Sequence, residues 1–180
     1  MKRSNIVLTG YRCSGKTSVG KIIAKRIDMN FYDTDELIEK SAGRSIGEIV
    51  EKDGWDGFRE IEKAVIRDVS ELNNAVIATG GGAVMFEDNI KNLKKNGRVV
   101  WLEGDVDILM KRMEKDNGEG RNRPSLTGVD PVVETRKVLE MRNPLYQKAA
   151  DLVINTDRLS LDEVADRIMK AFSSQLSAKD

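Results

Sequence analysis

The sequence contains no histidine and a single cysteine, Cys13, and each shortage excludes a class of chemistry. Without imidazole there is no histidine general base, and the common histidine-based metal sites are excluded. Proton transfer must therefore depend on carboxylates, lysine, tyrosine or water. One cysteine cannot form a disulfide within the chain, which suits a reducing cytoplasm.

Net charge and long apolar runs are missing as well. The 30 basic and 30 acidic residues cancel, so no overall field favours nucleic acid or a membrane surface. No apolar run approaches the roughly 20 residues of a membrane span, and the chain enters a strand-like segment without an apolar signal-peptide core. With 180 residues, of which 39% are hydrophobic, we expect one cytoplasmic domain over 1–180 with one well-buried core.

Short apolar segments alternate with longer amphipathic ones. Continuously apolar segments are typical of strands buried on both faces of a parallel sheet. They occupy 6–8, 76–78, 99–102 and 152–154, with a weaker segment at 30–32. Apolar residues recur at helical spacing over 58–72 and 161–172, and Ser160 with Glu163 forms a capping-box pattern before the latter. This alternation predicts a three-layer α/β/α sandwich around about five parallel strands.

Residues 10–17, GYRCSGKT, lie between the first apolar segment and a helix-like one. They match GxxxxGK[ST], in which backbone N–H groups surround a phosphate chain, the lysine reaches the β- and γ-phosphates, and the hydroxyl binds Mg²⁺. An ordinary Gly-rich turn rarely has both flanks, so the segment predicts a site for ATP or another nucleoside triphosphate. We expect the nucleotide to contact Gly10, Arg12, Cys13, Ser14, Gly15, Lys16, Thr17 and Ser18.

Asp33 and Asp35 follow the segment at 30–32 directly. Ligands of an open α/β sheet lie beyond the carboxyl ends of its strands, so both carboxylates should lie near the phosphate loop. There Asp33 would support Mg²⁺ and Asp35 would face a substrate hydroxyl. Capping of the next helix is the alternative, and the two roles are compatible.

Gly80, Gly81 and Gly82 follow the third apolar segment. Three glycines at this edge of the sheet indicate that something packs directly against backbone, although a flexible turn is the alternative.

Arg59 and Arg142 are candidates for anion binding. Glu62, three residues after Arg59, can brace its guanidinium, although this spacing usually means a surface ion pair. Pro144 disturbs the helical pattern beside Arg142. Aimed into one crevice, two arginines would bind a carboxylate or phosphate.

The polar, Gly-rich segment 117–124, NGEGRNRP, interrupts two helical patterns. Beside a phosphate site this is typical of a mobile lid, which we place at about 112–127; a solvated connection is the alternative. Arg121 or Arg123 would then neutralise charge in a phosphoryl-transfer transition state. The polar tail at about 174–180 is expected to fray.

Taken in order, these motifs resemble the shikimate kinase family, in the nucleoside-monophosphate-kinase-like branch of P-loop phosphotransferases. Besides the phosphate loop, the resemblance is carried by 33–35 (DTD), 43–46 (GRSI), 58–59 (FR) with Glu62, 80–84 (GGGAV), 123–124 (RP) and 142–146 (RNPLY). It implies ATP-dependent phosphorylation of the 3-hydroxyl of shikimate, a step of aromatic amino-acid biosynthesis. The implied fold is a five-stranded parallel sheet in the order 2-3-1-4-5.

The resemblance also implies roles on the acceptor side. Asp35 would bind substrate hydroxyls and orient or deprotonate the attacking one. Arg59 and Arg142 would hold the shikimate carboxylate, and the backbone of 80–82 would close one side.

On the donor side, the resemblance implies that Lys16 binds the phosphates and that Arg123 is the lid arginine. Thr17 and Asp33 would serve Mg²⁺, and Arg112 would flank the adenine. The catalytic residues would thus be Lys16, Asp35 and Arg123.

Cys13 departs from the family, which usually has a small residue there, and the lid reads RPSL rather than RPLL. A thiol near a helix N-terminus, flanked by Arg12 and Lys16, could be reactive. A small side chain tolerated in a tight loop is the favoured interpretation.

Three alternatives remain open. A gluconate kinase would share the loop and lid but would not need the Arg59 and Arg142 pair. A nucleotide-dependent switch is disfavoured because the chain has no NKxD motif. A polynucleotide kinase is disfavoured because no basic stripe is present. We expect a monomer acting on small molecules.

Overall fold

The computed structural model describes residues 4–116 and 130–176, with side chains up to residue 172. Within these residues, strands and helices alternate along the chain. In order they are β1 (Asn5–Thr9), α1 (Lys16–Arg26), β2 (Asn30–Asp33), α2 (Thr34–Ala42), α3 (Ile46–Ser70), β3 (Ala75–Ala78), the 3-10 helix η1 (Ala83–Met85), α4 (Glu87–Asn96), β4 (Gly97–Glu103), α5 (Val106–Asp116), α6 (Pro131–Ala149), β5 (Leu152–Asn155) and α7 (Leu161–Leu176).

The five strands form one parallel sheet in the order β2-β3-β1-β4-β5. Helices connect the strands because a parallel pair needs a long crossover to return the chain to the same end. This confirms the predicted fold and strand order.

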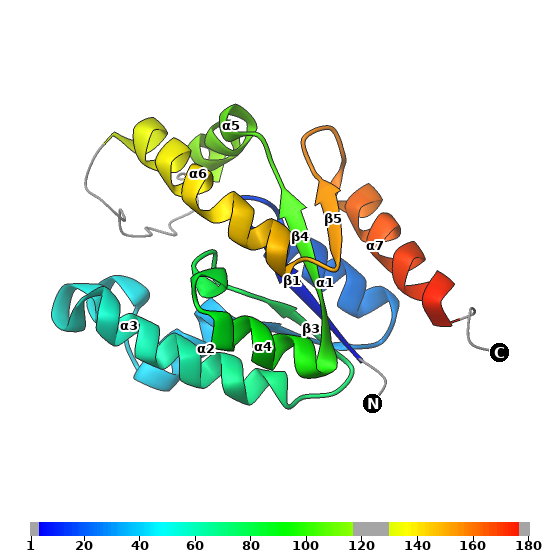
Figure 1. Ribbon diagram of the computed structural model, residues 1–180, viewed down its shortest axis with the longest axis horizontal. Coiled ribbons are helices and arrows are strands. Elements are labelled where there is room, and N and C mark those ends of the chain that lie inside the picture. The colour runs from blue at the N-terminus through cyan, green and yellow to red at the C-terminus, as the bar shows by residue number, and fades with distance from the viewer. Residues whose placement is uncertain (1–3, 117–129, 177–180) are drawn as a thin grey trace.

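Helices cover both faces of the sheet, as Figure 1 shows. On β1, Val7 faces a core shared with α3, α4 and the C-terminal part of α6, whereas Ile6 and Leu8 face a core shared with α1 and α7. All three side chains are buried. The apolar run is therefore continuous because neighbouring residues point into two different hydrophobic layers.

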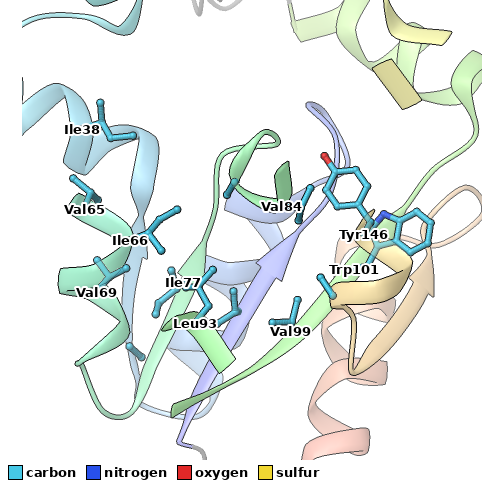
Figure 2. Packing of buried hydrophobic residues seen from close by; sticks show 14 of the residues in the cluster. Ile38, Val65, Ile66, Val69, Ile77, Val84, Leu93, Val99, Trp101 and Tyr146 are labelled. Carbon is cyan, nitrogen blue, oxygen red and sulfur yellow. The ribbon is translucent and has the colours of Figure 1, made fainter. Parts of the chain in front are cut away.

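The larger core ends in an aromatic pair next to the carboxyl ends of the strands. Figure 2 shows Tyr146 of α6 beside Trp101 of β4. Their rings stack with centroids 5.6 Å apart and an interplanar angle of 21°. Such a pair stabilises the packing by about 0.5–1.5 kcal/mol beyond the burial of its area. The ring of Tyr146 is thus held firmly where the core meets the loops.

Two helix starts follow their sequence signals. The predicted capping box before α7 is confirmed, since the Ser160 hydroxyl accepts from the Glu163 N–H and the Glu163 carboxylate accepts from the Ser160 N–H. Ser45 and Glu48 form the same box at the start of α3. Helix α3 is kinked at Gly54, whose φ of 72° is left-handed and favours glycine. The kink redirects the helix just before the residues that line the candidate site.

No helix in the two described stretches is long and apolar enough to cross a membrane.

Candidate active site

The strand ends bring the predicted segments to one edge of the sheet. Ala78, the last residue of β3, is in register with Leu8 of β1 and Asp33 of β2. An open cleft lies at this edge, where the ligands of open α/β sheets bind. It is lined by Tyr11, Arg12, Asp35, Ile46, Trp55, Phe58, Arg59, Glu62, Gly80, Gly81, Gly82 and Arg142.

The phosphate loop is curled around its own lysine. Lys16 is 8% exposed, and its Nζ donates to the carbonyl oxygens of Gly10 at 2.9 Å and Tyr11 at 2.8 Å. Gly10 has a φ of 143°, and a Cβ there would lie 2.5 Å from the carbonyl oxygen of Leu102, so glycine is required. The Ser14 hydroxyl is buried and has no hydrogen-bond partner among the described residues. A buried polar atom of this kind fits a loop that receives an oxygen-rich ligand.

Thr17 and Asp33 place two oxygen groups beside the loop. The Thr17 hydroxyl donates to Asp33 Oδ2 at 2.7 Å, while Asp33 Oδ1 accepts from the Asp35 N–H at 3.0 Å. Asp33 is therefore the N-cap of α2, as predicted in one of its two interpretations. A hydroxyl and one carboxylate fit Mg²⁺, which takes most of its ligands from water and substrate phosphates. Among the described residues no group of three or more carboxylates or cysteines forms a self-sufficient metal cage.

Arg59 is held from two sides. Its Nη1 donates to Glu62 Oε2 at 2.6 Å, and the Glu62 side chain is fully buried. The guanidinium carbon lies 5.5 Å from the ring centroid of Trp55 and 4.9 Å from that of Phe58, within the range of cation–π contact. The predicted brace by Glu62 is confirmed, and it is a buried pair rather than a surface one.

Glu62 is a buried carboxyl group whose surroundings shift its pKa in opposite directions. Burial raises the pKa of its carboxyl group, the charge and hydrogen bond of Arg59 act in the opposite direction, and the nearby Asp35 carboxylate raises it further. A Cβ on Gly80 would lie 2.9 Å from both Asp35 Oδ1 and Glu62 Oε1. Both carboxylates therefore pack closely on Gly80, and this glycine is there for close approach rather than for a flexible turn.

Arg142 lines the same cleft from helix α6. It is 7% exposed, and its Nε has no hydrogen-bond partner among the described residues. The predicted disturbance by Pro144 does not end the helix, because α6 continues through it to Ala149. The structure thus brings Arg59 and Arg142 into one crevice, as the family resemblance implies. Two guanidinium groups there can bind a carboxylate or a phosphate.

Comparison with known proteins agrees with this geometry. The model of the family described as shikimate kinase matches residues 12–173. The chain belongs to the shikimate kinase family. The shikimate kinase of Syntrophus aciditrophicus (strain SB) is 42% identical over 179 residues, which cover 95% of this chain and 92% of the relative. That of Caldanaerobacter subterraneus subsp. tengcongensis is 42% identical over 168 residues, covering 93% and 95%.

Solved structures agree as well. Acinetobacter baumannii shikimate kinase in complex with shikimate matches with a TM-score of 0.89 and 35% identity over 96% of this chain and 94% of that one. A gluconokinase from Sinorhizobium meliloti matches with a TM-score of 0.55 at 16% identity, which shows the shared fold alone. As a member of the shikimate kinase family, the chain is an enzyme, a transferase of the kinase class.

Several predicted nucleotide residues lie outside the cleft lining. Arg112, in helix α5, donates to the side-chain and main-chain oxygens of Thr156 at 2.9 and 2.7 Å, beside β5. Ser18 is exposed on α1. Arg12 lines the cleft but pairs with Glu134 of α6 at 3.1 Å. Their roles toward ATP remain predictions.

The lid lies mostly beyond what the structure covers. Of the predicted range 112–127, residues 112–116 end helix α5, and 117–127 fall outside the described residues, as do Arg121 and Arg123. The fraying tail was placed at about 174–180, of which 177–180 are likewise outside them.

Cys13 has different neighbours from those that a reactive thiol requires. Arg12 is paired with Glu134, and Lys16 binds the loop carbonyls. One polar neighbour of the thiol is a carboxylate, with Sγ 3.7 Å from Asp116 Oδ2. These contacts favour the interpretation of Cys13 as a small side chain in a tight loop.

Residue patterns alone missed the apolar wall of the cleft, formed by Ile46, Trp55 and Phe58. The signal that indicates it is spacing: Trp55 precedes Arg59 by four residues, so the two share a helix face.

Proposed function

We propose that this protein transfers the γ-phosphoryl group of ATP to the 3-hydroxyl of shikimate. The observation that carries the proposal is the meeting of Arg59, Arg142 and Asp35 in one cleft beside the phosphate loop. A small polyhydroxylated carboxylate needs such a set: paired cations for its carboxylate, and an acceptor carboxylate for its hydroxyls.

The acceptor is held by charge and by shape. Arg59 and Arg142 bind the carboxylate of shikimate, with Arg59 already oriented by Glu62 and by two aromatic rings. Because side-chain freedom of Arg59 is restricted before the substrate arrives, less entropy is lost on binding. Asp35 binds the 3-hydroxyl, orients it toward the γ-phosphate and accepts its proton.

The donor is held by the phosphate loop. Lys16 leaves the carbonyls of Gly10 and Tyr11 for the β- and γ-phosphates, while backbone N–H groups of the loop surround them. Thr17 and Asp33 hold Mg²⁺, which offsets the charge of the phosphate oxygens when bound. Arg123 closes over the γ-phosphate and stabilises charge in the loose transition state. Arg112 flanks the adenine. The supporting contact for the metal is the Thr17–Asp33 hydrogen bond.

A coupled assay of ADP release tests the proposal. With Mg·ATP, shikimate should give saturable turnover, whereas gluconate and nucleosides should give the background rate of ATP hydrolysis. Turnover with gluconate but not with shikimate would establish the gluconate kinase alternative. Absence of turnover with every acceptor would favour the nucleotide-dependent switch.

The cytoplasmic location and the monomeric state stay predictions from the sequence. The location rests on the single cysteine and on the absence of a long apolar run in the sequence. The monomeric state rests only on the small size of a kinase of this kind.

A further inference from the structure

Tyr146 is a buried phenol whose hydroxyl reaches the glycine triplet. The residue is 0% exposed, and its Oη donates to the carbonyl oxygen of Gly81 at 2.5 Å. Figure 2 shows the hydroxyl at the end of the ring that points away from the core. The ring itself is fixed by stacking on Trp101. A rigid side chain therefore holds one peptide of the glycine triplet in place.

The peptide that Tyr146 holds joins Gly81 to Gly82. The described part of the chain has no cis peptide, so the carbonyl and the N–H of this unit point in opposite directions. With the Gly81 carbonyl directed at Tyr146, the Gly82 N–H points away from it. Gly82 lines the cleft and packs against the Arg59 guanidinium so closely that a Cβ there would overlap it. The peptide thus lies between the aromatic pair and the proposed carboxylate site.

The phosphate loop confines the same peptide from another direction. A Cβ on Gly81 would lie 3.2 Å from the Gly10 carbonyl oxygen and 3.4 Å from Tyr146 Oη. The backbone therefore has little room to rotate, and the hydroxyl supplies the directional contact that selects its orientation.

We propose that Tyr146 is a positioning residue for the acceptor: its hydroxyl fixes the Gly81–Gly82 peptide so that the Gly82 N–H donates to the carboxylate held by Arg59 and Arg142. This rests on the proposed function, because the ligand is the carboxylate of shikimate. A backbone N–H adds a directed, charge-assisted hydrogen bond to the two cations.

The phenol is suited to this role at every working pH. Burial raises the pKa of Tyr146, so the hydroxyl stays protonated and remains a donor. Arg142 lies four residues before Tyr146 on α6, and its positive charge lowers the pKa of the phenol against the larger effect of burial. One helix therefore carries both a direct ligand of the carboxylate and the residue that orients the backbone ligand.

The test is Tyr146→Phe, which keeps the ring on Trp101 and removes only the hydroxyl. We expect the KM for shikimate to rise about tenfold, with kcat within about twofold and the KM for ATP unchanged, since the lost contact acts on the bound carboxylate in ground and transition states alike. Tyr32→Phe, in strand β2, is the matched control and should leave all three values unchanged.

A shikimate analogue with a primary alcohol in place of the carboxylate separates positioning from loosened structure. If Tyr146 acts through the carboxylate, Tyr146→Phe and the wild type should have the same KM for this analogue. The proposal is overturned if Tyr146→Phe raises the KM for shikimate, for the analogue and for ATP by the same factor and also lowers the melting temperature. That result would mean that Tyr146 has only a structural role. An unchanged KM for shikimate would overturn it too. Failure of the proposed function is distinct, because the wild type itself would then not turn over shikimate.

Discussion

The two halves of the proposed site are assembled in different ways. The donor half is eight consecutive residues, 10–17, which curl around Lys16 and need only one turn between β1 and α1. The acceptor half is gathered from four segments, 33–35, 55–62, 80–82 and 142–146, which meet only when the sheet is complete. Donor geometry is therefore local, whereas acceptor geometry depends on packing over most of the chain.

The halves also differ in how their cations are held. Lys16 is satisfied by carbonyl oxygens of its own loop, which phosphates can replace. Arg59 is bound to a buried carboxylate on its own helix, and Arg142 lines the same cleft. We infer that the donor half rearranges when its ligand binds, while the acceptor half is largely ready for its ligand. The variants below separate these two behaviours.

The largest effect is expected from Lys16→Ala, which removes the cation that stabilises the negative charge of the phosphates in the proposed transition state. We expect kcat to fall by about a hundredfold or more, with the shikimate dissociation constant almost unchanged. Steady-state kinetics and isothermal titration with shikimate measure the two values. Lys21→Ala, an exposed lysine of the same helix, is the control. A large loss of shikimate affinity in Lys16→Ala would show that the halves are not separable.

Arg59→Ala and Arg142→Ala should weaken shikimate binding at the acceptor half. Each removes a cation from the carboxylate site, so we expect the KM for shikimate to rise by about ten- to a hundredfold and the KM for ATP to stay within about twofold. Arg67→Ala, on the exposed side of α3, is the control for Arg59. Wild-type shikimate affinity in both variants would make the carboxylate assignment wrong.

Gly82→Ala tests whether close packing sets the acceptor half. The new Cβ would overlap the Arg59 guanidinium, which must then move from its place beside Glu62. We expect about a tenfold rise in the KM for shikimate without an effect on ATP. Gly47→Ala is the matched control, because its Cβ would meet the Ser45 hydroxyl oxygen only at 3.9 Å and, among the described residues, nothing else beyond its chain neighbours and nearby helix backbone within 4 Å. If the two variants behave alike, packing at Gly82 does not govern the site.

The smallest effect is expected from Glu62→Gln and is measured as the melting temperature at a series of pH values. Because burial raises the folded-state pKa of Glu62 above the ordinary 4.5, its contribution to stability is fully present below that pH and is lost as pH rises through the folded value. Glutamine does not ionise and keeps an oxygen for Arg59. The melting temperature of the variant minus that of the wild type should therefore increase by about 2–4 °C as the pH is raised from 4.5 to 8. A difference that is constant or shrinks with pH would contradict the assignment.

The sequence predicted most of the fold and the donor loop because their signals are local. Continuous apolar runs gave the strands, and residues 10–17 carry the whole loop. The pair of Arg59 and Glu62 was also predicted, since both lie on one helix face. Family resemblance, not spacing, was needed to link Arg59 to Arg142, because they are 83 residues apart and meet only through packing.

Other features could not be predicted for related physical reasons. The hydrogen bond from Tyr146 to Gly81 joins a helix to a loop 65 residues earlier in the chain. The contact of Arg112 with Thr156 and the pairing of Arg12 with Glu134 are likewise choices among many possible partners. Pro144 was expected to disturb its helix, but α6 tolerates it because the surrounding packing overrides a local preference.

The central claim is that the acceptor half presents one hydroxyl of shikimate to ATP. The most direct test is to incubate the protein with Mg·ATP and shikimate and to locate the transferred phosphoryl group by phosphorus–proton correlation NMR. The account predicts a single product, phosphorylated at the 3-hydroxyl, with one ADP formed per product. Phosphorylation at another hydroxyl, or ADP formed with inorganic phosphate alone, would contradict it.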